Sequence, residues 1–154
     1  MVLFDILNKL NIQYDLVEHK AVFNCEQAQE IKKLIDGIGC KNLFVTDKHS
    51  FYLIILKDDK KADLKSIAQK IGTKRLSFCS EQQLMDILKL KIGSVSPFGI
   101  VNDSENKVTL LIDSDLKNKK LLFHPNINTK TISIEFDDLI KFIEYEKNKY
   151  ILIQ

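Results

Sequence analysis

The stretch 39–47 most constrains the fold, because it is typical of one strand of a β-hairpin. A turn glycine precedes its apolar run, an aspartate ends it, and a second apolar run at 51–56 follows at hairpin distance. Side chains alternate between faces along a strand, so Lys41 is expected to share a face with Leu43 and Val45. A lysine there either reaches solvent from the strand end or lies in a lined pocket. The pattern alone favours the first, since lysine is rarely buried.

Length and composition indicate a single domain spanning 1–154. The chain has 154 residues with 45% hydrophobic content, which is enough for one full core and too little for two comfortable ones. The formal net charge is only +2. This near-neutral balance argues against a protein that binds DNA nonspecifically along its length, so no DNA partner is expected. It leaves room for a local basic patch that binds RNA.

Cysteine usage and hydropathy predict a reduced, cytoplasmic protein. Cys25, Cys40 and Cys79 are odd in number and far apart, so neither a disulfide framework nor a zinc ribbon is indicated. No apolar run approaches the ~18 residues of a membrane span, and the first residues lack the basic start of a signal peptide. We therefore expect no membrane partner.

Hydrophobic periodicity predicts a mixture of helices and strands. Asn24 is a candidate N-cap, and Ser80 with Gln83 forms a candidate capping box. Helices are expected over 2–10, 25–35, 63–71 and 81–88, with a last one that starts at Asp137 or Asp138. Strands are expected over 13–18, 39–47, 51–56, 75–78, 108–113, 120–123, 131–134 and 150–153.

The order of these elements predicts an α/β fold. Strands and helices mix without a regular βαβ alternation, and several strand pairs are linked too briefly for parallel crossovers. We therefore expect one domain with a mixed, mostly antiparallel sheet or an open barrel, flanked by helices. The sequence shows no repeat, linker or low-complexity tract.

Glycine and proline gather at three places. Gly37 and Gly39 precede Lys41, Pro125 follows His124, and the segment 93–99 carries Gly93, Pro97 and Gly99. Glycine permits close approaches that other residues resist, and proline fixes φ. The pattern indicates three shaped loops, although any loop needs such residues.

Other signals of chemistry are few. No glycine-rich phosphate-binding motif is present, the histidines have no metal-ligand spacing, and neither a cofactor nor a metal is expected. A Cys–His nucleophile pair stays open, since its partners need to meet only in space. All three cysteines lie in apolar stretches, which favours small buried hydrophobes.

Several stretches together carry a family resemblance. They are 18–23, 41–44, 75–78, 93–99, 101–103 and 123–126, with Asn128, Thr129 and Thr131. In this order they resemble the YbaK/ProX aminoacyl-tRNA deacylases, free-standing relatives of the editing domain inserted in bacterial prolyl-tRNA synthetases. The sequences VSPFG and FHPxxNT are similar to the ProX branch, which implies hydrolysis of alanine mischarged on proline tRNA.

The resemblance also implies roles for individual residues. Lys41 matches the essential lysine of the family, and 93–97 matches its GxxxP loop, whose backbone N–H groups face the reacting end. The catalytic set implied is Lys41, Gly93, Ser96 and Pro97. The substrate-binding set implied is Asn42, Phe98, Gly99, His124, Phe23, Glu18 and His19.

Three positions depart from the family pattern. Lys20 stands where a proline or small residue is common, Asn24 where a threonine is usual, and Cys79 at an alanine-like position. The first two border the expected pocket entrance. The amino-acid preference is therefore less constrained than the reaction.

The reaction implied is hydrolysis of the ester that joins an amino acid to the 3′-terminal ribose. The sequence shows no Ser-His-Asp arrangement for an acyl-enzyme. Lys41 and the loop amides are expected to stabilise charge, and the family view is that the vicinal hydroxyl of the tRNA helps to activate water. His124 is either a general base or, as we favour, a hydrogen-bonding pocket wall.

The expected partner is the acceptor end of tRNA, proline tRNA in particular, and contact with prolyl-tRNA synthetase stays open. Lys57, Lys60, Lys61, Lys74 and Arg75 are candidates for RNA contacts, although each also fits solvated surface.

Two alternatives remain for the function. One is deacylation of another small amino acid, such as cysteine or serine, and the other is a non-catalytic module that binds tRNA or a synthetase.

Overall fold

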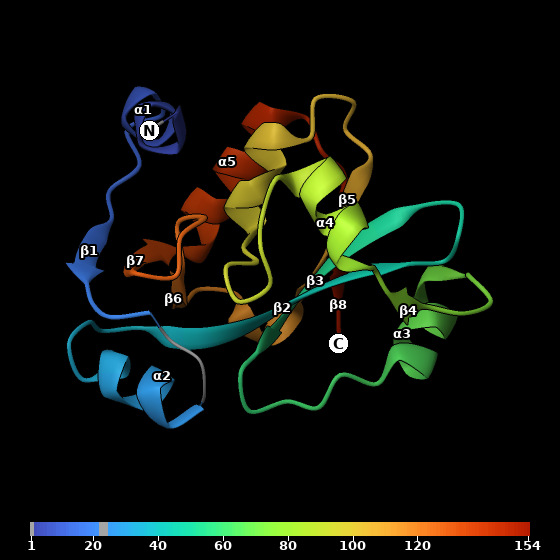
Figure 1. The fold of residues 1–154 in the computed structure, drawn as a ribbon, viewed down its shortest axis with the longest axis horizontal. Coiled ribbons are helices and arrows are strands. Elements are labelled where there is room, and N and C mark those ends of the chain that lie inside the picture. The colour runs from blue at the N-terminus through green and yellow to red at the C-terminus, as the bar shows by residue number, and fades with distance from the viewer. Residues whose placement is uncertain (1, 22–24) are drawn as a thin grey trace.

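The computed structural model describes residues 2–21 and 25–154, and its centre is a twisted sheet of eight strands (Figure 1). Hydrogen-bonded neighbours follow the order β1-β7-β6-β2-β3-β5-β8, and β4 pairs with β2 beside this path. The strands are β1 (Asp15–Glu18), β2 (Ile38–Thr46), β3 (Phe51–Lys57), β4 (Ser77–Phe78), β5 (Val108–Asp113), β6 (Lys120–Phe123), β7 (Lys130–Glu135) and β8 (Tyr150–Ile153).

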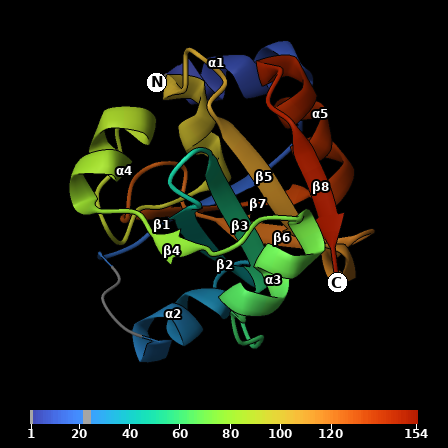
Figure 2. The same ribbon diagram turned by 90° about the vertical axis from the view of Figure 1, so that its right-hand side faces the viewer.

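Helices cover both faces of this sheet. Figures 1 and 2 show α1, α4 and α5 on one side of the sheet, and α2 and α3 towards the other. The helices are α1 (Val2–Lys9), α2 (Cys25–Lys32), α3 (Leu64–Ile71), α4 (Glu81–Leu88) and α5 (Phe136–Glu146), and two 3-10 turns are η1 (Pro97–Asn102) and η2 (Ser114–Leu116). None of the helices in the described part of the chain is long and apolar enough to cross a membrane.

Strand directions confirm the expected mixed sheet. The β2–β3, β2–β4, β1–β7 and β6–β7 pairs are antiparallel, whereas β2–β6, β3–β5 and β5–β8 are parallel. The predicted hairpin is β2–β3, with Cys40 opposite Lys57 and Thr46 opposite Phe51. The sheet is open, with β1 and β8 at the two ends of the strand order.

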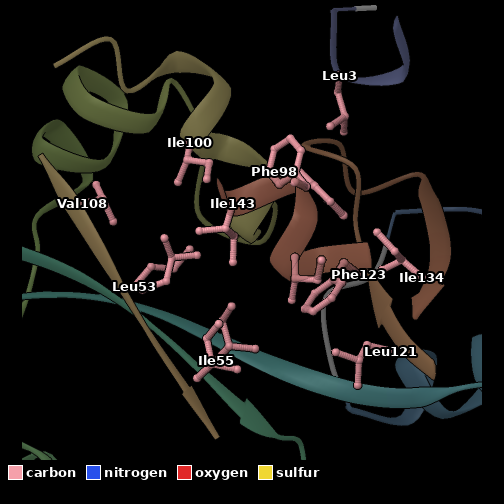
Figure 3. Packing of buried hydrophobic residues seen from close by; sticks show 14 of the residues in the cluster. Leu3, Leu53, Ile55, Phe98, Ile100, Val108, Leu121, Phe123, Ile134 and Ile143 are labelled. Atoms are coloured by element: carbon pink, nitrogen blue, oxygen red, sulfur yellow. The ribbon is translucent and has the colours of Figure 1, made fainter. Parts of the chain in front are cut away.

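The apolar run of β3 divides the core into two layers. Alternation sends Leu53 and Ile55 into the larger layer, beneath α1, α4, α5 and η1. Ile54 and Leu56 point the other way, into a smaller layer beneath α3. A strand buried on both faces reads as a continuous apolar run, which is the pattern at 51–56. Figure 3 shows the larger layer, where Phe98 packs near Phe123 and Ile143.

Several local signals fix the helix ends as predicted. The Asp63 side chain accepts a hydrogen bond from the Ser66 N–H, and Gly72 ends α3 in the left-handed conformation. At the start of α4, the Ser80 and Gln83 side chains form the reciprocal bonds of a capping box.

Other helix boundaries differ from the prediction. The α2 helix ends at Lys32 instead of continuing through Ile35, and its predicted cap Asn24 lies outside the described residues. The α5 helix starts at Phe136, before both predicted aspartates, without a side-chain cap. Burial of Phe136 in the larger core layer accounts for that early start. The segment 93–99, predicted to be loop throughout, enters η1 at Pro97.

Phe98 offers a test of the core. Its side chain is 0% exposed and packs edge-on against Phe123 and Phe142, with ring centroids 5.7 and 5.2 Å away. We expect Phe98→Ala to lower the free energy of unfolding by about 3–5 kcal/mol, because it leaves a large cavity. Phe78 is 62% exposed, so the matched variant Phe78→Ala is expected to cost less than about 0.5 kcal/mol. Urea denaturation measures both, and equal losses would contradict this assignment.

Candidate functional site

A cavity of about 300 Å³ opens where β2 parts from β6. These two strands pair only at Ile38 and Gly39, opposite Leu121 and Leu122. Beyond this point β2 continues along β3, and the chain after β6 turns away at His124. The cavity wall consists of Gln29, Ile31, Lys32, Gly39, Cys40, Lys41, Asn42, Asp58, Asp59, Leu122, Phe123, His124 and Thr131.

Because β2 and β6 separate after Gly39, polar backbone groups of β2 lie beside the cavity. The Gly39 carbonyl accepts from Asp58 N–H on the β3 side, and the Phe44 carbonyl accepts from Cys79 N–H on the opposite side. Because backbone groups alternate along an antiparallel strand, those of Asn42 point away from β3, between β6 and β4. The side chain of Asn42 also lines the cavity, and its Oδ1 is buried without a hydrogen-bond partner among the described residues.

Lys41 lies in the cavity wall, half-buried. Its Nζ donates a hydrogen bond to the carbonyl oxygen of Lys60, in the turn after β3. Lys60 is itself anchored, since its ammonium lies 2.7 Å from Asp113 Oδ1 and 2.6 Å from Asp115 Oδ2. An ammonium has three N–H donors, so within the described part of the chain two remain on Lys41 for a ligand.

The buried carboxylate of Asp113 stabilises this turn. Burial acts to raise the pKa of Asp113, but hydrogen bonds from the Lys60 ammonium and the Asp115 and Lys57 N–H groups outweigh it and hold the pKa below its ordinary value. The hydrogen bonds to Asp113 and Asp115 raise the pKa of Lys60. Lys60, suggested from sequence as an RNA contact, is therefore paired with two carboxylates, the buried Asp113 and the exposed Asp115.

A second ion pair crosses the cavity wall. Lys32 of α2 pairs with Asp58, directly over Gly39. A Cβ on Gly39 would meet the flexible ends of both side chains, so this ion pair would have to shift to accommodate it. Asp58 is half-buried, ion-paired and part of the cavity wall, although it lies in a run of charged residues.

His124 lies opposite β2 with one ring nitrogen already bonded. Its Nδ1 is 2.9 Å from the Lys130 carbonyl oxygen, and its ring centroid is 5.9 Å from that of His19. Burial lowers the pKa of His124 below the ordinary histidine value. The hydrogen bond to Lys130 opposes this shift, and the charge of His19 adds to it. The imidazole is therefore neutral near pH 7.

The segment 93–99 lies beside the cavity wall but outside it. Asn126, two residues after His124, donates to the Phe98 carbonyl at 3.1 Å, and the space beside Gly93 faces Asn128. The Ser96 hydroxyl is fully buried and accepts from Phe98 N–H, which caps η1. Pro97, Phe98 and Gly99 are also buried.

The structure thus gathers part of the set implied by the resemblance. One cavity is lined by Lys41, Asn42 and His124. The ring of His19 packs against that of His124. Glu18 is exposed at the end of β1, and Phe23 lies outside the described residues. Cavity residues that sequence reasoning did not single out include Gln29, Ile31, Lys32 and Leu122. Among the other cavity residues, Phe123 and Thr131 carried a signal through the stretches around His124, and Gly39 did so as a glycine before Lys41.

The thiols of Cys40 and Cys79 are poor nucleophiles in this environment. Burial raises the pKa of Cys40 far above its ordinary value, and the nearby Asp58 adds to the shift. Burial also raises the pKa of Cys79 to about 11. Since the thiolate is the reactive form, the two raised pKa values support the interpretation of Cys40 and Cys79 as small hydrophobic side chains. The described residues contain no cluster of His, Cys, Asp and Glu that could hold a metal ion.

Comparisons with known proteins match nearly the whole chain. The family model of the aminoacyl-tRNA editing domain matches residues 19–142. The prolyl-tRNA editing protein ProX of Acetoanaerobium sticklandii is 38% identical over 152 residues, covering 96% of this chain and 92% of that protein. The multifunctional Ser/Thr-tRNA deacylase ProXp-y of Escherichia coli is 26% identical, covering 94% of this chain and 87% of that protein.

A solved structure has the same fold. It is described as a candidate trans-editing enzyme for prolyl-tRNA synthetase, and it superimposes with a TM-score of 0.74 at 15% identity. The match covers 97% of this chain and 92% of the other.

The lowered pKa of His124 gives a pH prediction. We expect its NMR titration midpoint to lie below the ordinary value of about 6.5, returning there in urea. The unfolded chain then binds this proton at higher pH than the folded one, so His124 reduces stability as pH falls below about 6.5. His124→Gln assigns the resonance. A folded-state midpoint at or above that of the unfolded chain would contradict the burial argument.

Proposed function

Because the chain belongs to the aminoacyl-tRNA editing domain family, we propose that it hydrolyses mischarged aminoacyl-tRNA in trans, with alanine on proline tRNA as its main substrate. The reaction class follows from the family, whose members are ester hydrolases of this kind. The substrate is proposed on the likeness to the A. sticklandii protein, which is named as a prolyl-tRNA editing protein.

One observation carries the proposal. A lysine ammonium, a strand N–H and a neutral histidine surround a cavity of about 300 Å³. Ile31, Leu122 and Phe123 give the same cavity an apolar wall. Its size suits a small amino acid attached to the terminal ribose. The polar groups come from β2 and from the segment after β6, so they surround the space from two sides.

The proposed step is attack of water on the ester carbonyl carbon. The carbon–oxygen bond to the ribose breaks, the ribose oxygen takes up a proton, and the free amino acid leaves. Lys41 and the Asn42 N–H supply fixed donors for the oxygen on which negative charge develops. A single preorganised donor of this kind contributes about 3–4 kcal/mol to lowering a barrier. His124 serves as a hydrogen-bonding wall, and the vicinal hydroxyl of the tRNA helps to activate the water.

The need for such an enzyme follows from the limits of binding selectivity. A synthetase pocket discriminates against one missing methylene by only about 1–3 kcal/mol. A site built for proline therefore cannot firmly reject the smaller alanine. A second site that hydrolyses the wrong ester after its release removes the error, and a cavity with a restricted volume can exclude the correct amino acid.

A second candidate substrate carries a hydroxyl or thiol. The E. coli relative is named as a Ser/Thr-tRNA deacylase. The buried, unpartnered Asn42 Oδ1 would favour such a substrate, since a hydroxyl can donate to it after a small shift of the side chain. Serine and cysteine on proline tRNA are therefore the second choice, and binding without turnover is the third.

A deacylation assay tests these choices. Proline tRNA charged with alanine, serine, cysteine or proline is incubated with the wild type and with Lys41→Ala. We expect alanine to be released fastest, proline to be retained, and the variant to be slower by about 10²-fold or more, because a charge-stabilising donor is lost.

Lys65→Ala provides the matched control. Lys65 is an exposed lysine of α3, the helix that covers the smaller core layer, and its removal is expected to leave the rate unchanged. Faster release of serine or cysteine would select the second substrate class. Binding of alanyl-tRNA without release by the wild type would contradict the enzymatic proposal.

A further inference from the structure

A chain of hydrogen bonds links His124 to its neighbours on β7 and β1. It joins His124 to Thr131 of β7, and Thr131 to His19 at the end of β1. The Thr131 Oγ1 is 2.8 Å from His19 Nε2 and 3.4 Å from His124 Nδ1. Each imidazole also meets a backbone carbonyl through its Nδ1, at 2.9 Å to Lys130 for His124 and at 2.8 Å to Lys20 for His19.

The two carbonyls determine where the protons lie. A carbonyl oxygen only accepts, so the Nδ1 of each ring must carry a hydrogen. In a neutral imidazole the other nitrogen is then an acceptor. His19 Nε2 therefore accepts a hydrogen bond, and the Thr131 hydroxyl is the donor within reach. The same reasoning leaves His124 Nε2 as an acceptor, without a partner among the described residues.

The hydrogen bond from Thr131 to His19 determines whether the Thr131 hydroxyl donates to His124 or accepts from it. A free hydroxyl could rotate and donate to His124 Nδ1, which would support the opposite tautomer. Because His19 takes its hydrogen, Thr131 presents only lone pairs to His124. The Lys130 carbonyl and the Thr131 oxygen then both face Nδ1 as acceptors. Thr131 is 4% exposed, so water does not easily replace it.

We propose that Thr131 and His19 are positioning residues that act with the Lys130 carbonyl to hold His124 in its Nδ1–H tautomer, so that Nε2 is left as a hydrogen-bond acceptor towards the cavity. The role in turnover rests on the proposed function, whereas the tautomer does not. An acceptor at this place meets hydrogen-bond donors, and an aminoacyl ester with its attacking water has them as hydroxyl, water and ammonium groups. The wrong tautomer would turn an N–H towards these donors.

The first experiment observes the tautomer directly. Long-range ¹H–¹⁵N NMR spectra distinguish a protonated ring nitrogen from a bare one, and they are recorded on the wild type without ligand at pH 8, above the ordinary histidine pKa. We expect His124 to show a protonated Nδ1 and a bare Nε2, with His124→Gln assigning the signals. A protonated Nε2 would overturn the proposal whether or not the protein deacylates tRNA.

The second experiment tests positioning through Thr131→Val, which removes the hydroxyl while keeping the side-chain shape. We expect kcat for deacylation to fall about fivefold to tenfold, which corresponds to the loss of one hydrogen bond. KM is expected to change less than about twofold. The ¹⁵N signals of His124 are expected to move towards averaged values, because the ring loses one anchor. Thr131→Ser restores the hydroxyl and is expected to restore both readouts.

Thr109→Val is the matched control, since Thr109 lies on β5, paired with Tyr52 of β3 outside the cavity wall. It is expected to change neither readout. A Thr131→Val rate within twofold of the wild type, or no rescue by Thr131→Ser, would overturn the positioning role. If the wild type shows no deacylation while the tautomer is as expected, the proposed function fails and the hydrogen-bond assignment stands.

Discussion

The divided pairing of β2 is the constraint on which the rest of the structure depends. This strand has three partners, β3 along most of its length, β6 at its start and β4 at its end. Between β6 and β4 one edge of β2 has no neighbouring strand. A backbone edge left unpaired inside a protein is costly unless something else binds it. The molecule places its cavity at this gap, where the loss of sheet pairing makes peptide groups available to a ligand.

The local parts of this arrangement could be predicted from the sequence. The hairpin at 39–56, the capping box at Ser80 and the end of α3 at Gly72 all depend on neighbours close in the chain. The mixed sheet followed from the order of elements. Lys41, Asn42 and His124 were singled out through resemblance, because strand periodicity alone favoured a solvent-reaching lysine at position 41.

The parts that could not be predicted depend on contacts distant in sequence. The burial and pairing of Asp58 could not be predicted from its charged neighbours in the chain, because its partner Lys32 lies on a helix 26 residues earlier. The segment 93–99 reads as a loop shaped for a ligand, yet Phe98 fills the core because α5 brings Phe142 against it. The Ser96 hydroxyl likewise caps η1. Residue type and loop composition do not distinguish such structural uses from contact with a substrate.

The charges around the cavity bear on the role proposed for Lys41, since that role requires a cation that no carboxylate neutralises. Asp58 is paired with Lys32, and Lys60 with Asp113 and Asp115, so these charges are largely neutralised locally. Lys41 instead donates to a carbonyl, which leaves its positive charge uncompensated by a carboxylate among the described ion pairs. With His124 neutral, Lys41 is the cation of the described cavity wall that lacks a carboxylate partner, and Ile31, Leu122 and Phe123 make that wall partly apolar. A charge in such surroundings acts more strongly on a developing oxyanion than it would in water.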